Sequence, residues 1–166
     1  TILVGMGGSA SSDAGAGMAQ ALGDRLLNHK GRPIGPGAEG LRSLARIDAG
    51  ETAVFSKRVK IVALSDVDTP LTGPRGSARV FGPQKGATAA QVKIMEEAMA
   101  RFARIVKRDL GREVSRLPGA GAAGGLGAGL AAFLRASLVR GADWILDALG
   151  LDADLKRVDL VLTGEG

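Results

Sequence analysis

The chain has 166 residues and a formal net charge of +5, a length that suits one ordinary domain and is short for two. Hydrophobic residues make up 45% and charged residues 23%, which is typical of a folded domain and excludes a disordered chain. Cysteine is absent and histidine occurs once, so disulfides, thiolate catalysis and metal centres built on cysteine or paired histidines are excluded.

Two further function classes are disfavoured by what the sequence lacks. Aromatic residues make up 3%, too few for a base-stacking surface, so we expect no nucleic-acid partner. No apolar run reaches the roughly 18 residues that a membrane span needs, and the apolar start lacks the basic residues of a secretory signal. We therefore expect a cytoplasmic protein without a membrane partner.

Strands and helices are expected to alternate along the chain. An apolar strand over residues 1–4 enters a Gly/Ser turn. A helix is expected over 13–27, because apolar side chains recur there every four residues. The next expected elements are a Gly/Pro-rich loop over 31–40, a short helix over 41–47 and a buried strand over 58–64.

The clearest predicted helix covers residues 88–110. Thr88 and Gln91 have the spacing of a capping box, apolar side chains then step by three and four along one face, and Gly111 ends the pattern. The alternation of elements predicts one α/β region over residues 1–166, a layered sheet with mainly parallel strands and flanking helices. The remaining expected elements are a helix that begins within 121–125 and carries apolar residues up to 138 inward, a short helix over 143–149 and a last strand over 158–162.

The outlying number in the composition is 26 glycines. They cluster rather than scatter, and glycine concentrates where the backbone turns sharply or lies close to a ligand. Loops of this kind on a folded chain favour a phosphate-handling enzyme. The clusters cover residues 5–17, 31–40, 73–86 and 119–129.

The first glycine cluster follows the first expected strand and precedes a helix. Backbone amides and the positive dipole end at a helix N-terminus attract anions, while glycines allow close approach and serine hydroxyls donate hydrogen bonds. The alternative is a capped helix after a tight turn, with Asp13 complementing the helix dipole. The candidate phosphate- or substrate-binding residues of this turn are Gly7, Gly8, Ser9, Ser11, Ser12 and Asp13.

Carboxylates follow two of the expected strands. Asp66 and Asp68 come directly after the strand over 58–64, where ligands gather in α/β sheets, and could hold Mg²⁺ through water or activate a hydroxyl. Their alternative role is to form a turn before Pro70. Glu165 follows the last expected strand and is a candidate ligand of a metal or a substrate hydroxyl, although Gly-Glu-Gly also forms ordinary turns.

Two basic residues lie on glycine-flanked loops of the third cluster. Arg75 and Lys85 have few acidic neighbours in the sequence. Both suit the neutralisation of a phosphoryl group, Arg through its planar fork and Lys as a point charge. The alternative is an ordinary surface loop, since such loops carry basic residues routinely.

A basic ridge lies on the long predicted helix, opposite its apolar face. Arg101, Arg104 and Arg108 form this ridge, and Glu97 precedes Arg101 by four residues, the favourable order for an ion pair. We interpret the ridge as a solvated helix face rather than as a nucleic-acid surface.

The glycine cluster at 119–129 formally satisfies Gly-x-Gly-x-x-Gly. The segment before it, 112–117, is too charged and short for the buried strand that a dinucleotide site requires, and Pro118 interrupts the approach. A dehydrogenase that binds NAD here is therefore the weakest alternative. Close helix packing or a second anion-binding turn accounts better for these glycines, of which Gly121 and Gly124 are candidate phosphate- or substrate-binding residues.

Four stretches of the sequence are more specific together than any one alone. They are GMGGSASSDAGAGMAQALG, SDVDTPLTGPRGSARVFGPQKGA, LPGAGAAGGLGAGL and DLVLTGEG. In this order they resemble the type I glycerate kinase family, and the resemblance runs from Gly5 to Gly166.

The resemblance implies ATP-dependent phosphorylation of D-glycerate with Mg²⁺ as cofactor, usually to 2-phosphoglycerate and alternatively to 3-phosphoglycerate. The expected partners are therefore a nucleotide and a small organic acid. Family members are longer and have two α/β domains with the active site between them. The chain is accordingly expected to be the central part of a longer two-domain kinase.

The resemblance and the chemistry of phosphoryl transfer suggest the same roles for the candidate residues. Gly7, Gly8 and Ser9 are expected to cradle an anion. Asp66 is expected to act as the base, or to organise Mg²⁺, for the attacking hydroxyl. Lys85 and Arg75 would neutralise the transferring charge, and the expected metal ligands are Asp68 and Glu165.

Two further alternatives stay open. The turn over 5–10 is close to the Gly-Leu-Gly-Ser-Ser-Ala loop of the GHMP small-molecule kinases, although the later stretches have no counterpart in that family. The chain is alternatively a non-catalytic anion- or nucleotide-binding fragment that turns over no substrate without the rest of the protein.

Overall fold

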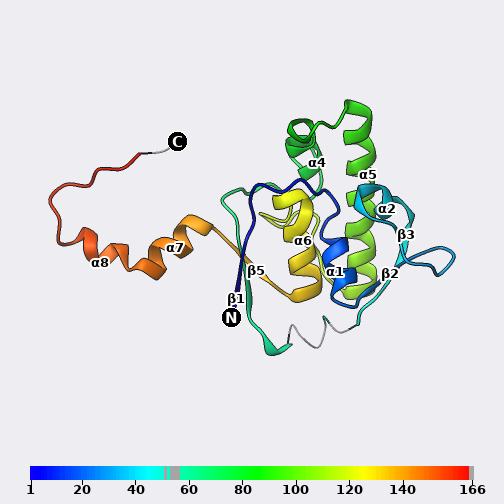
Figure 1. Ribbon diagram of the computed structural model, residues 1–166, viewed down its shortest axis with the longest axis horizontal. Coiled ribbons are helices and arrows are strands. Elements are labelled where there is room, and N and C mark those ends of the chain that lie inside the picture. The colour runs from blue at the N-terminus through cyan, green and yellow to red at the C-terminus, as the bar shows by residue number, and fades with distance from the viewer. Residues whose placement is uncertain (51, 53–56, 165–166) are drawn as a thin grey trace.

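Among the residues that the structure describes, three parallel strands form the larger of two sheets (Figure 1). The structure is a computed structural model and describes residues 1–50, 52 and 57–164. The prediction of an α/β fold with mainly parallel strands is confirmed, as are the strands expected over 1–4 and 58–64. In the order of the sheet, the strands are β1 (Ile2–Gly5), β4 (Ile61–Leu64) and β5 (Ser137–Val139).

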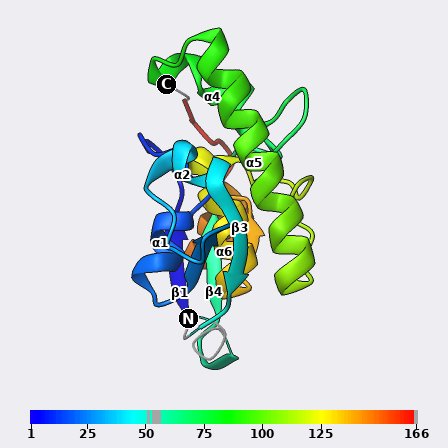
Figure 2. The ribbon, with the colours of Figure 1, turned by 90° about the vertical axis from the view of Figure 1, so that its right-hand side faces the viewer.

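Two helices cover one face of this sheet (Figures 1 and 2). α6 (Ala122–Leu134) packs against β4 and β5, and α1 (Ala16–Ala21) packs against α6. The helix expected to begin within 121–125 is confirmed, but it stops before Arg135, which has a left-handed φ of 54°. Residues 137–139 then form β5 instead of continuing the helix, because they pair with the central strand.

The helix expected over 13–27 is wrong in its second half. α1 stops before Gly23, whose φ is 97°, and β2 (Arg25–Asn28) follows. β2 pairs in antiparallel fashion with β3 (Leu44–Asp48), and Leu26 of this ribbon is buried. Of the side chains whose four-residue spacing predicted one continuous helix, Leu26 is buried in β2, whereas Leu22 lies just after α1 and is 42% exposed.

The short helix expected over 41–47 is also wrong. α2 (Gly37–Ser43) begins inside the stretch that was expected to be a loop, and β3 replaces the rest of the expected helix. Pairing with β2 determines this second half, and local spacing does not report such a tertiary effect.

α5 (Ala89–Leu110) confirms the helix expected over 88–110 and crosses the structure beside α2 and β3 (Figure 2). Thr88 and Gln91 form the predicted capping box, and Gly111 ends the helix with a left-handed φ of 68°. The short helices before it are α4 (Ser77–Phe81) and the single 3₁₀ turn η1 (Pro83–Lys85).

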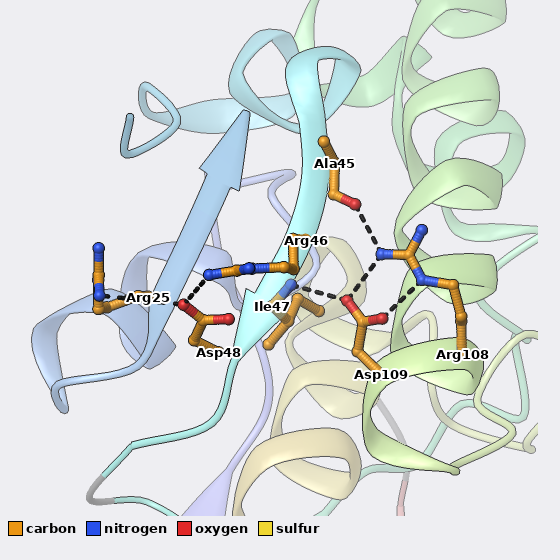
Figure 3. A network of polar contacts seen from close by, with 7 residues as sticks. All are labelled: Arg25, Ala45, Arg46, Ile47, Asp48, Arg108 and Asp109. Atoms are coloured by element: carbon orange, nitrogen blue, oxygen red, sulfur yellow. Dashed lines mark hydrogen bonds and ion pairs between the residues drawn. The ribbon is translucent and has the colours of Figure 1, made fainter. Parts of the chain in front are cut away.

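A polar network ties α5 to the β2–β3 ribbon (Figure 3). Asp109 accepts a hydrogen bond from the amide of Ile47 at 2.8 Å, and Arg108 donates to the carbonyl of Ala45 at 2.6 Å. The hydrogen bond from Arg108 is the main reason why the pKa of Asp109 lies below its usual range. The network fixes how the C-terminal end of α5 lies against β3.

The C-terminal segment extends away from the sheet (Figure 1). α7 (Gly141–Leu149) confirms the helix expected over 143–149, and α8 (Leu151–Leu155) follows it. The strand expected over 158–162 is not formed, since this segment has no strand partner among the described residues, and Leu162 is 88% exposed. An apolar pattern becomes a strand only where a neighbouring strand satisfies its backbone groups.

Candidate functional site

The turn after β1 is open to solvent. The amide of Met6 still bonds to the carbonyl of Leu64 at 3.0 Å, and the chain then leaves the sheet at the carboxyl end of its strands. Gly7 and Gly8 are exposed, and a Cβ atom built on either meets no atom within 4 Å. Gly8 has a left-handed φ of 60°, which favours glycine for backbone reasons. Packing does not require glycine here, and the backbone is accessible to an anion.

Lys85 joins this turn to the third glycine cluster. Its Nζ donates to the carbonyl of Ser11 at 2.7 Å and to the hydroxyl of Ser9 at 3.3 Å, although 74 residues separate Lys85 from Ser11. Burial lowers the pKa of Lys85. A partly desolvated ammonium lacks some of its hydration, and a neighbouring anion compensates for that loss.

Two cavities meet at Lys85. The larger, of about 530 Å³, lies between the turn after β1, the start of α2 and the start of α5. The smaller, of about 210 Å³, lies between the same turn, η1 and the start of α6. Gly7, Gly8, Ser9, Lys85 and Gly124 line the smaller cavity, and Ser12 and Lys85 line the larger one.

The start of α6 is a tight backbone junction. Ala123, Gly124 and Gly125 have left-handed φ values of 51°, 68° and 90° in succession. Gly124 accepts a hydrogen bond from the amide of Ala14, and a Cβ atom on Gly124 would lie 2.7 Å from the carbonyl carbon of Ser11. The buried hydroxyl of Ser77 donates to the carbonyl of Gly121 at 2.7 Å. Close packing, one of the two interpretations of this glycine cluster, is therefore what these glycines provide.

A dinucleotide-binding turn needs a buried strand directly before its glycines, and this cluster has none among the described residues. Residues 112–117 form no strand, so the glycines do not connect a sheet strand to a helix. Gly124 nevertheless also lines the smaller cavity beside Gly7 and Ser9. The packed junction thus forms one wall of the space that the open turn faces.

Asp13 lies two residues before Gly15, the N-cap residue of α1, and its carboxylate accepts hydrogen bonds from the start of this helix. Its Oδ1 accepts from the amide of Gly15 at 2.9 Å and its Oδ2 accepts from the amide of Gly17 at 2.9 Å. Both carboxylate oxygens accept hydrogen bonds from backbone amides at the start of α1. This arrangement matches the alternative in which Asp13 complements the helix dipole.

Three of the other predicted residues, Asp66, Asp68 and Arg75, line neither cavity at Lys85. Asp66 accepts a hydrogen bond from the amide of Ala142 at 2.9 Å, at the start of α7, and lines neither cavity at Lys85. Asp68 lines a separate cavity of about 70 Å³ together with Arg140. Arg75 is exposed and also lines neither cavity at Lys85, and Glu165 lies outside the described residues.

The described residues contain neither a metal cluster nor a membrane span. No group of three or more His, Cys, Asp or Glu side chains in the described ranges is arranged to hold a metal ion. Likewise, none of the described helices combines the length and apolar character that crossing a bilayer requires.

Sequence reasoning missed several residues that line the cavities. Glu39, Gln91 and Met95 line the larger cavity, and Phe81 lines the smaller one. Gln91 was recognised only as a cap, and its Oε1 does accept from the amide of Thr88 at 2.8 Å. A capping box fixes where a helix begins, but nothing in it reports that the helix start faces a cavity.

Comparison with known proteins gives one consistent result. The model of the glycerate kinase family matches residues 1–166. Glycerate kinase of Halalkalibacterium halodurans is 51% identical over 165 residues, which is 99% of this chain and 43% of that protein. Glycerate 2-kinase of Escherichia coli is 43% identical over 165 residues, again 99% of this chain and 43% of that protein.

A solved structure agrees with these relatives. The crystal structure of a protein described as glycerate kinase 2 from Salmonella typhimurium LT2 superposes with a TM-score of 0.87 at 47% identity, covering 99% of this chain and 45% of that one. The chain thus spans less than half the length of the relatives that it matches. Because the family model matches every residue from 1 to 166, the chain belongs to the glycerate kinase family.

Proposed function

We propose that the full-length protein phosphorylates D-glycerate, with ATP as the donor and 2-phosphoglycerate as the product. The observation that carries this proposal is the meeting of Gly7, Ser9 and Lys85 at one cavity, where exposed glycine backbone lies beside a cation. Phosphoryl transfer requires positioning and charge stabilisation more than covalent chemistry, and these groups supply both. The family match over residues 1–166 favours this reaction over that of the GHMP kinases.

The two cavities suit the two substrates. The larger, of about 530 Å³, has the volume of a site for a nucleotide-sized ligand, and Gln91 and Glu39 offer polar groups there. The smaller, of about 210 Å³, suits the three-carbon acid together with the transferring phosphoryl group. Lys85 lies between them, so its ammonium can neutralise charge on the group that passes from one to the other.

Asp66 remains the proposed general base, a role that requires the remaining part of the protein to bring the substrate hydroxyl to it, since Asp66 lines neither cavity at Lys85. Its Oδ1 is oriented by the amide of Ala142, and its Oδ2 faces the backbone of Gly141. A carboxylate held through one oxygen can accept a proton from the substrate hydroxyl on the other. Arg75, which is exposed, is proposed to pair with substrate or nucleotide once the remaining part of the protein is present.

Mg²⁺ is proposed to enter with the nucleotide. Once bound, Mg²⁺ would neutralise charge on the phosphate oxygens of the nucleotide. Asp68 and Glu165 are the side chains proposed to coordinate the metal. An enzyme with these small-molecule substrates is proposed to act in the cytoplasm.

The test is a substrate panel given to the full-length protein with ATP and Mg²⁺ and analysed by phosphorus NMR. D-glycerate is expected to give a phosphate signal split into a doublet by the single proton on C2, whereas 3-phosphoglycerate would give a triplet. Glycolate, L-glycerate and glycerol serve as controls. No phosphoester from D-glycerate would contradict the proposal, and a triplet would correct the position of transfer.

A non-catalytic role for this chain by itself is the second candidate, favoured by its coverage of 43% of the relatives' length. In this case the 166-residue chain binds an ATP analogue or phosphate but turns over no glycerate. Equilibrium dialysis and the NMR assay, run on this chain beside the full-length protein, separate the two candidates.

A further inference from the structure

The three arginines of the basic ridge on α5 have three different environments. Arg108 is engaged by Asp109 and by the carbonyl of Ala45 (Figure 3). Arg101 donates from Nε to the carbonyl of Leu44 at 2.5 Å. Arg104 is exposed and makes no hydrogen bond or ion pair within the described part of the chain. The ridge is therefore not one uniformly solvated face.

Arg101 and Arg104 line a cavity of about 200 Å³ between α2 and α5. Arg42 of α2 lies on its opposite side, and Glu97 is the one carboxylate among the lining residues. Three guanidinium groups thus meet at this space, where Glu97 is one carboxylate and Glu39, outside the cavity, pairs with Arg42. Three positive charges face two carboxylates, so the remaining positive charge attracts an anion to this space.

Two of the three guanidinium groups are held in place. Arg101 is fixed by the carbonyl of Leu44 and by a second hydrogen bond, in which its Nη2 donates to Nε2 of His29 at 2.9 Å. Arg42 donates to Glu39 at 2.9 Å. Positioned guanidinium groups lose little conformational entropy when they bind, and their planar forks match the oxygens of phosphate. Arg104 is then free to close over a ligand.

We propose that this cavity binds a small phosphate-bearing anion, with the phosphate against Arg42, Arg101 and Arg104 and a hydroxyl of the ligand donating to Glu97. A volume of about 200 Å³ is below the range typical of drug-sized ligands, so the site takes a phosphate or a short phosphoester rather than a nucleotide. It lies beside the middle of α5 and the C-terminal end of α2, whereas the larger cavity at Lys85 lies beside the start of both helices. The proposal does not depend on the reaction proposed above.

The test is protection of individual arginines in the full-length protein from phenylglyoxal, read out by peptide mass spectrometry. Inorganic phosphate and glycerol phosphate are titrated in separate series, with chloride at matched ionic strength as control. We expect saturable protection of Arg101 and Arg104, with glycerol phosphate effective at lower concentration because its hydroxyls reach Glu97. Exposed Arg116, which is outside the cavity, is expected to react equally at all concentrations.

Two substitutions on α5 decide whether the binding is specific. Arg104→Gln removes one charge inside the cavity, and Lys93→Gln removes one charge from the exposed surface of the same helix. Arg104→Gln is expected to raise the phosphate concentration for half-maximal protection of Arg101 at least tenfold, and Lys93→Gln is expected to leave it unchanged. Equal weakening by both variants, or protection no better than with chloride, overturns the proposal. Glu97→Gln is expected to abolish only the preference for glycerol phosphate.

Discussion

Two glycine-rich regions of this chain look alike in sequence and differ in the structure. In the turn after β1, a Cβ atom on Gly7 or Gly8 would meet nothing within 4 Å. At the start of α6, a Cβ atom on Gly125 would lie 2.8 Å from the Cα of Ala14, and one on Gly129 would lie 2.6 Å from its carbonyl oxygen. Glycine thus leaves space for a ligand in the first region and allows two backbones to touch in the second. Density of glycine in the sequence does not distinguish the two uses, whereas the surroundings of each Cβ do.

The largest effect is expected at Gly124, where a substitution tests whether the two glycine-rich regions differ in packing. Gly124→Ala places a methyl group against the carbonyl of Ser11 and requires an alanine at a φ of 68°, so we expect a loss of at least about 3 kcal/mol in the free energy of unfolding. Gly7→Ala is the matched control and is expected to change that free energy by less than about 0.5 kcal/mol. Urea unfolding of the full-length protein measures both. Similar losses for the two variants would mean that the regions do not differ in packing.

The next effect concerns Lys85, which lies beside the open turn. Lys85→Gln removes the ammonium that donates to Ser11 and Ser9, and we expect turnover of D-glycerate to fall by about 10²-fold or more. Steady-state kinetics with the full-length protein measures this loss, and the fall is expected in kcat as well as in kcat/KM. Lys93→Gln removes the same charge from an exposed position on α5 and should leave both unchanged. If Lys85→Gln keeps a turnover within a factor of about three of the wild type, Lys85 does not contribute to catalysis.

A smaller effect is expected from the hydrogen bond that holds the packed region. Ser77→Ala removes the shorter of two hydrogen bonds that the carbonyl of Gly121 accepts, the other coming from the amide of Gly125 at 3.2 Å, and should cost about 1 kcal/mol of unfolding free energy. Ser43 makes the equivalent bond to the carbonyl of Gly40 at 2.8 Å from an exposed position. Ser43→Ala should therefore cost clearly less, since water replaces the lost donor. Thermal unfolding of both variants measures the two losses. A larger loss for Ser43→Ala than for Ser77→Ala would contradict burial as the cause.

The sequence predicted elements well where local chemistry determines them. The capping box at Thr88, the glycine stop at Gly111 and the apolar face between them fixed the longest described helix. Predictions failed where a distant strand determines the outcome, as in the β2–β3 ribbon over the expected helices at 13–27 and 41–47. A ribbon of this kind forms through contacts between segments some twenty residues apart, which spacing within one segment does not carry.

The candidate site was predictable in its parts and not in its assembly. The open turn was recognised from glycine and serine after an apolar strand, and Lys85 from its glycine-flanked loop. That these two meet follows from the position of η1 against the turn, a tertiary contact. Asp66 was placed correctly at the carboxyl end of β4, and the helix that became α7 was expected, but the bond between Asp66 and Ala142 is a tertiary contact that local patterns do not report.

The smallest expected effect is a dependence on pH, which the open turn should show and the packed junction should not. Burial lowers the pKa of Lys85, so its ammonium loses its proton at a lower pH than that of an ordinary lysine. Phosphate binding at the open turn should therefore weaken as pH rises through that lowered pKa, and equilibrium titration of phosphate at increasing pH measures it. The unfolded chain holds this proton more tightly than the folded one, so Lys85 itself makes the folded state slightly more stable as pH rises through the same window. The packed junction at Gly124 and Gly125 carries no titratable group, and its contribution to stability should stay constant there. An alkaline loss of binding that persists in Lys85→Gln would assign the titration to another group and separate the cation from the turn.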